Sequence, residues 1–318
     1  MRTLQISAQD RIPALGLGTW KSAKGEVGQA VTSAIELGYR HIDCAPIYLN
    51  EKEIGASLSR ALQDGGVRRE ELWITSKLWN NAHAKRHVQP ALESTLRDLR
   101  LEYLDLFLIH WPVHFQPGVA FPKKPEEYLP YQAIPLGETW QAMERLVEKG
   151  LCRYIGVCNF GINRLAGLLQ LADIPPAMNQ IELHPYLAQL DMLEFCQNNG
   201  ILLTAYSPLG SGDRPAAMKK RDEPSLLQHP QIVAIAEKYQ HTPAQVLIAW
   251  ALGRGTVVIP KSVDRQRQKE NLDATRLQLA EADRQQIDLL NSDYRYVDGN
   301  FFAGPGSPYT IETLWDGD

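Results

Sequence analysis

Three side chains in the first quarter of the chain have the types and spacing needed for proton transfer. Asp43 lies inside the apolar run HIDCA, residues 41–45, although aspartate is rarely buried without a partner. Lys77 ends a second apolar run and could neutralise the carboxylate if the two runs are adjacent strands. Tyr48 follows five residues after Asp43, so its hydroxyl could approach the same ammonium. Because a free tyrosine has a pKa of about 10, an ammonium about 4 Å away would lower that pKa and suit Tyr48 to proton transfer.

Eight apolar runs, each typical of a short buried strand, recur along the chain. They cover residues 14–20, 41–45, 72–78, 103–111, 154–160, 177–183, 201–208 and 256–262. Between several of these runs, apolar residues repeat with the period of an amphipathic helix. This alternation predicts parallel strands joined by right-handed crossovers, and hence a single-domain (β/α)8 barrel over residues 1–318. The rival fold, an open doubly wound sheet, usually carries a GxGxxG turn, and the sequence has none.

The ends of the predicted strands carry polar or aromatic residues. These are Trp20, Asp43, Lys77, His110, Asn159, Gln180, Tyr206 and Lys261. Taken singly, His110 could be a satisfied core histidine, Lys77 a surface lysine and Tyr206 ordinary packing. Strand ends of a (β/α)8 barrel meet at one rim, however, so the whole set predicts an active site there.

Three stretches fall outside the alternation of strands and helices. Residues 112–137 and 209–228 are expected to be long loops, and residues 296–318 a C-terminal tail. All three are rich in proline, glycine or aromatic residues, and loops of this length in a compact barrel are usually functional. We therefore expect them to wall the active site, with the tail closing it.

The charge balance excludes several classes of partner. The chain has 33 Lys and Arg against 37 Asp and Glu, so it offers no strongly basic surface for nucleic acid or an anionic membrane. No apolar run approaches the roughly 18 residues of a membrane span, and the N-terminus lacks the features of a signal peptide. These features predict a cytoplasmic protein whose partner is a small molecule.

Cysteine and histidine spacings give no support for a metal site. The four cysteines form no CxxC pair and are expected as reduced thiols. His83 and His87 are one helical turn apart and are interpreted as an ordinary solvent-exposed pair. Neither the HExxH metal motif nor the P-loop motif occurs in the sequence.

Five motifs, in this order, resemble the aldo-keto reductase superfamily and its aldehyde and aldose reductases. They are the stretch 38–55, LIHWP at 108–112, GVCNF at 156–160, YSPLG at 206–210 and IPKS at 259–262. The resemblance spans essentially the whole chain. It implies a (β/α)8 barrel that binds NADPH in extended form and reduces aldehydes, ketones or aldoses to alcohols, commonly as a monomer.

The resemblance also implies catalytic roles by position. Tyr48 would be the general acid that protonates the carbonyl oxygen as hydride arrives. Lys77 would lower the pKa of Tyr48, and Asp43 would hold Lys77. His110 would orient the carbonyl, and it stands where relatives that reduce steroid double bonds have glutamate, which favours carbonyl reduction here.

The same resemblance implies how the cofactor is held. Tyr206 would stack on the nicotinamide, and Asn159 and Gln180 would bind its carboxamide. The expected cofactor-binding residues are Thr19, Trp20, Asp43, Cys158, Asn159, Gln180, Tyr206, Ser207, Pro208, Leu209, Ser211, Lys261, Ser262, Val263, Arg267, Glu270 and Asn271, with Lys261, Ser262 and Arg267 on a 2′-phosphate.

Two residues depart from the pattern of the family. Cys158 stands where many relatives have serine, which removes a hydroxyl donor to the carboxamide. Asp264 either caps the next helix or repels the 2′-phosphate. The residues Lys261, Ser262 and Arg267 favour NADPH as the cofactor. Because of Asp264, NADH remains an alternative cofactor.

The expected substrate pocket is aromatic. Its walls would be Trp20, Ile47, Trp79, His110, Trp111 and Phe115, with the tail from Tyr296 onward on the opposite side. An apolar pocket with polar groups at its floor suits hydrophobic or small aldehydes, but it selects neither the physiological substrate nor the direction of the reaction.

Three other functions compete with carbonyl reduction. Lys77 could be the nucleophile of a Schiff-base aldolase, but Asp43 and Tyr48 would then be coincidental. Potassium-channel β subunits share the fold and bind NADPH as regulatory partners, with an N-terminal extension before the barrel. Tyr48 and Lys52 have the YxxxK spacing of short-chain dehydrogenases, but the glycine-rich turn of that fold is missing.

Overall fold

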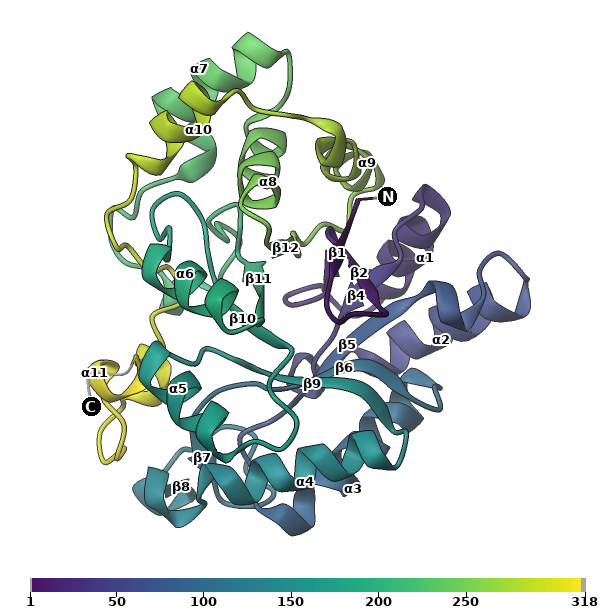
Figure 1. Ribbon diagram of the computed structural model, residues 1–318, viewed down its shortest axis with the longest axis vertical. Helices are drawn as coiled ribbons and strands as arrows, with labels where there is room; N and C mark the ends of the chain where they lie inside the picture. The colour runs from purple at the N-terminus through teal and green to yellow at the C-terminus, as the bar shows by residue number, and fades with distance from the viewer. Residues whose placement is uncertain (1, 316–318) are drawn as a thin grey trace.

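Eight parallel strands form the centre of the structure, a computed structural model in which residues 2–315 are described (Figure 1). In spatial order they are β3 (Leu17–Gly18), β4 (His41–Asp43), β5 (Trp73–Leu78), β6 (Leu104–Ile109), β9 (Cys152–Cys158), β10 (Met178–Glu182), β11 (Leu202–Tyr206) and β12 (Val257–Val258). Gly16 N donates to Val258 O, and Val258 N donates to Ala14 O, both at 2.9 Å, so the first strand also pairs with the last. The predicted (β/α)8 barrel is confirmed.

Each predicted strand is present, although the regular pairing is shorter than the apolar runs. The first run, residues 14–20, is reduced to β3 and isolated bridges to the last strand. A close approach explains this seam. A Cβ atom on Gly18 would lie 2.8 Å from the carbonyl oxygen of Ile259, so only glycine lets the two backbones meet there.

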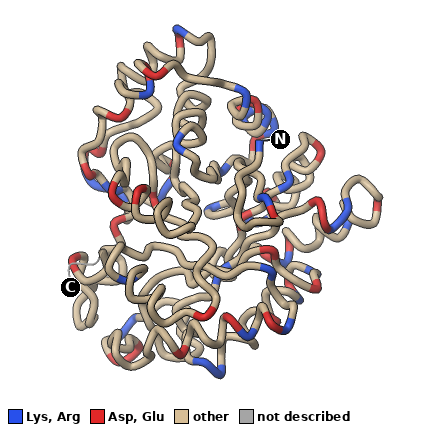
Figure 2. Tube along the Cα trace, viewed as in Figure 1, with Lys and Arg blue, Asp and Glu red and all other residues tan. Residues whose placement is uncertain are grey.

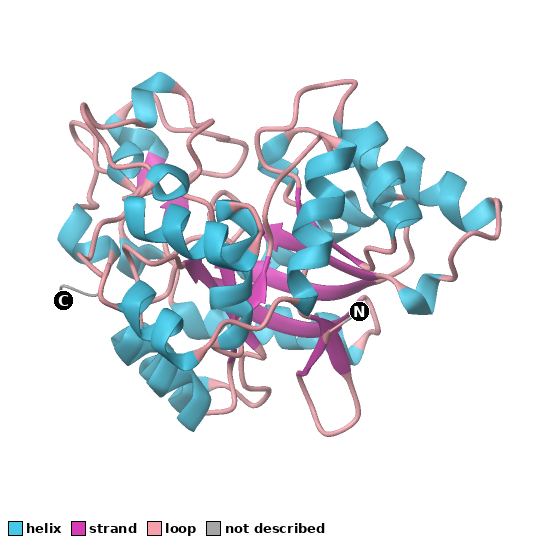
Figure 3. Cartoon of the chain, turned by 90° about the horizontal axis from the view of Figure 1, so that it is seen from above, coloured by secondary structure: helices cyan, strands magenta, loops and turns pink. Residues whose placement is uncertain are grey.

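Helices surround the barrel on its outer side (Figure 3). They are α1 (Val27–Leu37), α2 (Glu51–Gln63), α3 (Lys85–Leu99), α4 (Leu136–Glu148), α5 (Ile162–Leu171), α6 (Leu190–Asn198), α7 (Pro230–Tyr239), α8 (Pro243–Gly253), α9 (Arg265–Asp273), α10 (Glu281–Asp288) and α11 (Ile311–Leu314). Most bury one apolar face against the strands, as their sequence period predicts. The apolar helix α8 is buried almost all round because α7 packs on its outer side.

The end of the barrel at which the strands begin is filled with apolar side chains. An N-terminal hairpin of β1 (Thr3–Gln5) and β2 (Arg11–Pro13) packs there, a feature that the sequence did not predict. Its buried Ile12 joins a cluster that includes Trp73, Leu106 and Met178. The polar strand ends lie at the opposite rim, where the carboxyl ends of the parallel strands meet.

The three stretches predicted as loops or tail are more ordered than expected. Residues 112–137 contain a hairpin of β7 (His114–Phe115) and β8 (Tyr128–Leu129), and their last two residues already belong to α4. Residues 209–228 form a loop with two short 3₁₀ turns. The tail carries another 3₁₀ turn and α11, and its residues 316–318 lie outside the described part.

Charged residues of both signs alternate around the outside of the protein (Figure 2). None of the described helices is long and apolar enough to cross a membrane. The four cysteines are free and buried, which agrees with the predicted reduced thiols. The interpretation of His83 as solvent-exposed is wrong, because it precedes α3, is 1% exposed and has its Nδ1 2.8 Å from Nδ1 of His114.

Candidate active site

A cavity of about 840 Å³ opens at the rim formed by the carboxyl ends of the strands. The strand-end side chains that line it are Trp20, Asp43, His110, Asn159, Gln180, Tyr206 and Lys261. Lys77 lies beneath this surface, almost fully buried on β5. The strand ends therefore converge at one rim, as the sequence predicted.

The buried carboxylate of Asp43 has a partner on each oxygen. Lys77 Nζ donates to Oδ1 at 2.5 Å and to the carbonyl oxygen of Cys44 at 2.9 Å. Gln180 Nε2 donates to Oδ2 at 2.7 Å. Burial disfavours the charged form of Lys77, but the Asp43 carboxylate helps to raise the pKa of Lys77 overall, so the ammonium persists at neutral pH. The cation that the sequence requires beside Asp43 is Lys77.

Tyr48 reaches the cavity from the short 3₁₀ turn Pro46–Tyr48 that follows β4. Its ring centroid is 5.4 Å from Lys77 Nζ and 5.8 Å from the ring centroid of His110. Burial raises the pKa of Tyr48, and the Lys77 ammonium opposes this effect without overcoming it. The predicted net lowering is therefore wrong, because it left out the desolvation of the phenol. The hydroxyl stays protonated at neutral pH.

His110 lies beside Tyr48 at the floor of the cavity. Its ring meets the ring of Trp79 edge-on, with centroids 5.1 Å apart. Burial holds the pKa of His110 well below its usual range, and the positive charge of Lys77 lowers it further. The imidazole is therefore neutral and carries one N–H that can donate a hydrogen bond.

Asn159 joins two strand ends through its side-chain amide. Its Nδ2 donates to the carbonyl oxygen of His110 at 2.9 Å, and its Oδ1 accepts from the Tyr206 hydroxyl at 2.8 Å. The backbone of Asn159 has a φ of 60°, in the left-handed region that asparagine tolerates better than most residues. This network fixes Tyr206 at the cavity wall.

A cationic end of the cavity lies after β12. Lys261, Ser262 and Arg267 all line it. Asp213, from the loop 209–228, accepts from Lys261 at 3.0 Å and also pairs with Lys21. Partial burial raises the pKa of Asp213, but the two lysines together lower it to about 2, so the loop is tied across the cavity at neutral pH.

Asp264 caps the helix that carries Arg267. Its side chain accepts from the backbone N–H of Arg267 at 2.8 Å, so the capping role left open by the sequence is confirmed. Asp264 also lines the cavity, which places a negative charge beside the cationic end.

Most of the other predicted binding residues also line the cavity. They are Thr19, Ser207, Pro208, Leu209, Ser211, Val263, Glu270 and Asn271 from the set expected to bind the cofactor, and Ile47, Trp79 and Trp111 from the expected substrate pocket. The predicted cavity therefore exists along nearly its whole expected length.

Two predicted residues stand outside the cavity wall. Cys158 is buried in the apolar cluster inside the barrel, and Phe115 is buried behind Trp79, with their ring centroids 6.1 Å apart. The structure therefore does not place these two side chains in the cavity wall. Phe121, which the sequence analysis missed, lines the cavity instead because the β7–β8 hairpin turns it toward the rim.

A comparison with protein families matches the Aldo/keto reductase family over residues 14–292. The chain belongs to the aldo/keto reductase family. It is 56% identical over 316 residues to an aldo/keto reductase of Synechocystis sp., covering 99% of this chain and 97% of that one. It is 46% identical to the human aldo-keto reductase family 1 member A1, over 90% of this chain and 88% of the relative.

A solved structure agrees with this membership. The aldose reductase of Schistosoma japonicum superimposes with a TM-score of 0.88 at 39% identity, covering 98% of this chain and 99% of the other. The fold and the family are thereby shown for this aldo/keto reductase.

Sequence reasoning missed several cavity residues of this family member. Lys21 and Asp213 clamp the loop 209–228, whereas Val297 and Phe301 belong to the tail from Tyr296 onward that the sequence predicted as the opposite wall, without naming these residues. The position of Lys21 directly after the strand-end residue Trp20 was the one available signal. The others depend on how loops fold over the rim.

Glu51 is a buried carboxylate next to the site, on the first turn of α2. Ser76 and Thr95 donate to it at 2.6 and 3.2 Å, but burial outweighs these bonds and raises its pKa to about 7. A raised pKa contributes stability that is present below the unfolded-state pKa of about 4.3 and is lost as pH rises through the folded-state value.

We expect Glu51→Gln to remove that pH dependence. Between about pH 4.5 and 8 the wild type should lose roughly 3 kcal/mol of unfolding free energy relative to the variant. Urea unfolding at several pH values measures both proteins. Parallel stability profiles for the two would contradict this assignment.

Proposed function

We propose that the protein reduces aldehydes to alcohols, with NADPH as the hydride donor and Tyr48 as the general acid. The observation that carries the proposal is the buried Asp43–Lys77 pair beside Tyr48 and His110, at the floor of an aromatic cavity. In this proposal the protein is a single-domain, cytoplasmic monomer, as expected from its sequence.

The residues at the floor fit carbonyl reduction. Bound NADPH supplies the hydride. The neutral His110 N–H would hold the carbonyl oxygen, and Tyr48 would donate its proton to that oxygen. The Lys77 ammonium would then stabilise the tyrosinate that remains, and Asp43 keeps Lys77 in place.

The chemistry of the cavity fits an extended dinucleotide with a 2′-phosphate. One end of the cavity carries an ammonium, a hydroxyl and a guanidinium, from Lys261, Ser262 and Arg267. These groups together would bind a dianionic phosphate. Tyr206 offers a ring face for the nicotinamide, and the clamped loop 209–228 would cover the pyrophosphate. Gln180 and Asn159 already bond within the protein, so their bonds to a carboxamide would share or replace those contacts.

The walls favour apolar aldehydes over sugars. Trp20, Trp79, Trp111, Phe121 and Phe301 line the substrate end. Such a pocket gains free energy by burying apolar surface and offers few partners to the hydroxyl groups of an aldose. Ketones and aldoses are expected to be slower substrates.

The test is the loss of nicotinamide absorbance with NADPH or NADH and benzaldehyde, propanal or xylose. We expect turnover to prefer NADPH and to be most efficient, by kcat/KM, with benzaldehyde. Cofactor binding without turnover of any aldehyde would contradict the proposal and favour the regulatory alternative.

We expect Asp264→Ser to strengthen the preference for NADPH. Serine retains the helix cap, whereas the carboxylate that would repel a 2′-phosphate is removed. The KM for NADPH should fall about threefold to tenfold, while that for NADH stays unchanged. Asp273→Ser, which removes the same charge from the other end of α9, is the control. Equal effects on both cofactors would contradict the prediction.

A further inference from the structure

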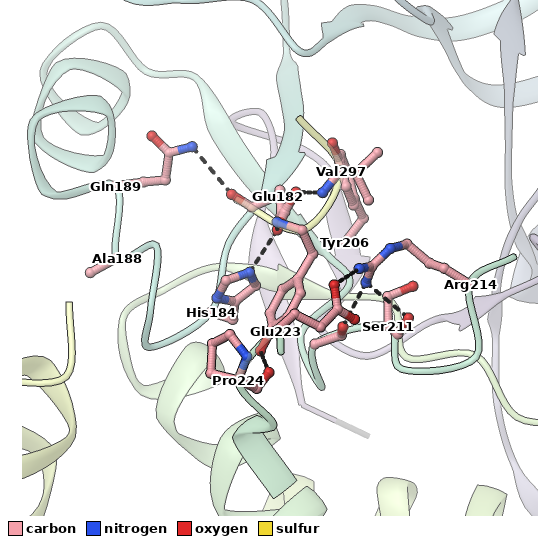
Figure 4. A network of polar contacts seen from close by, with 12 residues as sticks. Glu182, His184, Ala188, Gln189, Tyr206, Ser211, Arg214, Glu223, Pro224 and Val297 are labelled. Atoms are coloured by element: carbon pink, nitrogen blue, oxygen red, sulfur yellow. Dashed lines mark hydrogen bonds and ion pairs between the residues drawn. The ribbon is translucent and has the colours of Figure 1, made fainter. Parts of the chain in front are cut away.

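Glu182 is a fully buried carboxylate for which the proposed mechanism has no use. It lies on β10, two residues after Gln180, and is 0% exposed. Its Oε1 accepts from His184 Nε2 and from Tyr296 N, both at 2.7 Å, and its Oε2 accepts from Val297 N at 2.8 Å (Figure 4). Burial raises the pKa of Glu182, but these donors together with the charge of Arg295 lower it overall, so the carboxylate is ionised.

The two bonds that Glu182 accepts from the backbone N–H groups of Tyr296 and Val297 fix the start of the C-terminal tail. Val297, whose N–H is held, lines the cavity, and Phe301 four residues later lines it as well. Phe301 also meets Trp111 edge-on, with ring centroids 5.7 Å apart. The carboxylate on β10 therefore sets where the tail enters the substrate wall.

Tyr296, whose backbone N–H is bonded to Glu182, also holds the loop 209–228 through its side chain. The Tyr296 hydroxyl donates to the carbonyl oxygen of Pro224 at 2.7 Å. The Tyr296 ring is so close to Gly210 that a Cβ atom there would lie 3.1–3.2 Å from it. The guanidinium of Arg214 lies 5.0 Å from the ring centroid of Tyr296.

Arg214 extends this contact through the loop. It donates to the carbonyl oxygens of Gly210 and Ser211, both at 3.0 Å, and to Glu223 at 2.6 Å (Figure 4). The Ser211 hydroxyl in turn accepts from Lys21 Nζ at 2.6 Å, and both residues line the cavity. A continuous set of polar and ring contacts thus runs from Glu182 to the clamp over the cofactor end.

We propose that Glu182 is a positioning residue that couples the two lids of the cavity. By holding the backbone of Tyr296 and Val297, it places the tail against the substrate end and seats the loop 209–228 over the cofactor end. The inference rests on the proposed function for its substrate arm, whereas its cofactor arm needs only that NADPH binds.

Glu182→Gln tests the coupling with almost no change of shape. The amide group of glutamine must face at least one of the N–H donors that the carboxylate now satisfies, so a bond to the tail is lost. Glu144→Gln is a matched control. Glu144 is also buried and accepts from two backbone N–H groups, those of Asp173 and Ile174 at 2.8 and 2.9 Å, but it lies on α4, outside the cavity.

We expect Glu182→Gln to raise both the NADPH dissociation constant, measured by quenching of protein fluorescence, and the KM for benzaldehyde by about fivefold or more. The value of kcat should change less than about threefold, because no group that touches the reacting atoms is altered. Glu144→Gln should alter neither constant, even if it lowers the melting temperature equally. Equal effects of the two variants on the dissociation constant would overturn the proposal.

Tyr296→Phe provides a second, milder test that does not depend on the folding of the first variant. It removes only the bond to Pro224 O, so it should raise the NADPH dissociation constant about threefold or more and leave the KM for benzaldehyde unchanged. An unchanged dissociation constant would overturn the coupling. If the wild type binds NADPH but reduces no aldehyde, the proposed function fails, whereas the two shifts in dissociation constant would still support the coupling.

Discussion

Tyr48→Phe is expected to lower kcat for aldehyde reduction by about 10³-fold while changing the NADPH dissociation constant less than threefold. The variant keeps the ring that contacts His110 and loses only the proton that we assign to the carbonyl oxygen. Steady-state kinetics and fluorescence titration measure the two effects. A fall in kcat together with a large rise in the NADPH dissociation constant would instead indicate that the substitution had disrupted the site.

The raised pKa of Tyr48 adds a pH signature to this prediction. Because burial holds the pKa above its ordinary value of about 10, the wild-type kcat for reduction should not fall between about pH 6 and 9. Tyr154→Phe, at the opposite end of the barrel, is the control and should retain normal kinetics. Residual activity of Tyr48→Phe within tenfold of the wild type would rule out Tyr48 as the acid.

Lys77→Met is expected to damage both stability and catalysis. Removal of the ammonium leaves the Asp43 carboxylate buried with Gln180 as its one remaining partner within residues 2–315, and breaking a buried ion pair in this way costs about 3–5 kcal/mol. The raised pKa of Lys77 means that the pair contributes stability below the unfolded-state pKa of about 10.4 and loses it only above that pH. Urea unfolding at pH 7 should therefore show the full loss.

A double variant separates the two roles of Lys77. Asp43→Asn combined with Lys77→Met removes both charges, so most of the lost stability should return, because a neutral replacement of a buried pair is often tolerated. Activity should not return, because no cation remains to stabilise the tyrosinate. If Lys77→Met is within about 1 kcal/mol of the wild type, or if the double variant reduces aldehydes normally, the assigned role of the pair is wrong.

The sequence predicted the barrel and its rim well for a physical reason. Parallel strands that are buried on both faces have nearly continuous apolar sequences. A polar residue at the end of such a run, such as Asp43 or His110, therefore indicates a functional position at the rim. The partner of Asp43 could be identified because adjacent parallel strands bring their ends together. Short strands such as β1 and β7 lack this signal, since three or two residues show no period.

The parts that could not be predicted depend on long-range packing. The pKa of Tyr48 has the opposite net shift because desolvation is a property of the folded environment and not of the residue spacing. Phe115 and Phe121 differ in position because Phe115 pairs within β7, whereas Phe121 lies in the loop that joins β7 to β8 and lines the cavity. In the sequence Glu182 is one more residue of a predicted strand. Only the fold shows that the backbone N–H of Tyr296, 114 positions later, donates to its carboxylate.

The most direct test of the central claim uses NADPH in which both hydrogens at C4 of the nicotinamide are replaced by deuterium. The protein is incubated with this cofactor and benzaldehyde, and the benzyl alcohol is analysed by mass spectrometry, with Tyr48→Phe in parallel. We predict that the wild type transfers deuterium to the carbonyl carbon and that the variant forms almost no alcohol. Binding of the cofactor without any deuterated alcohol would contradict hydride transfer at this site.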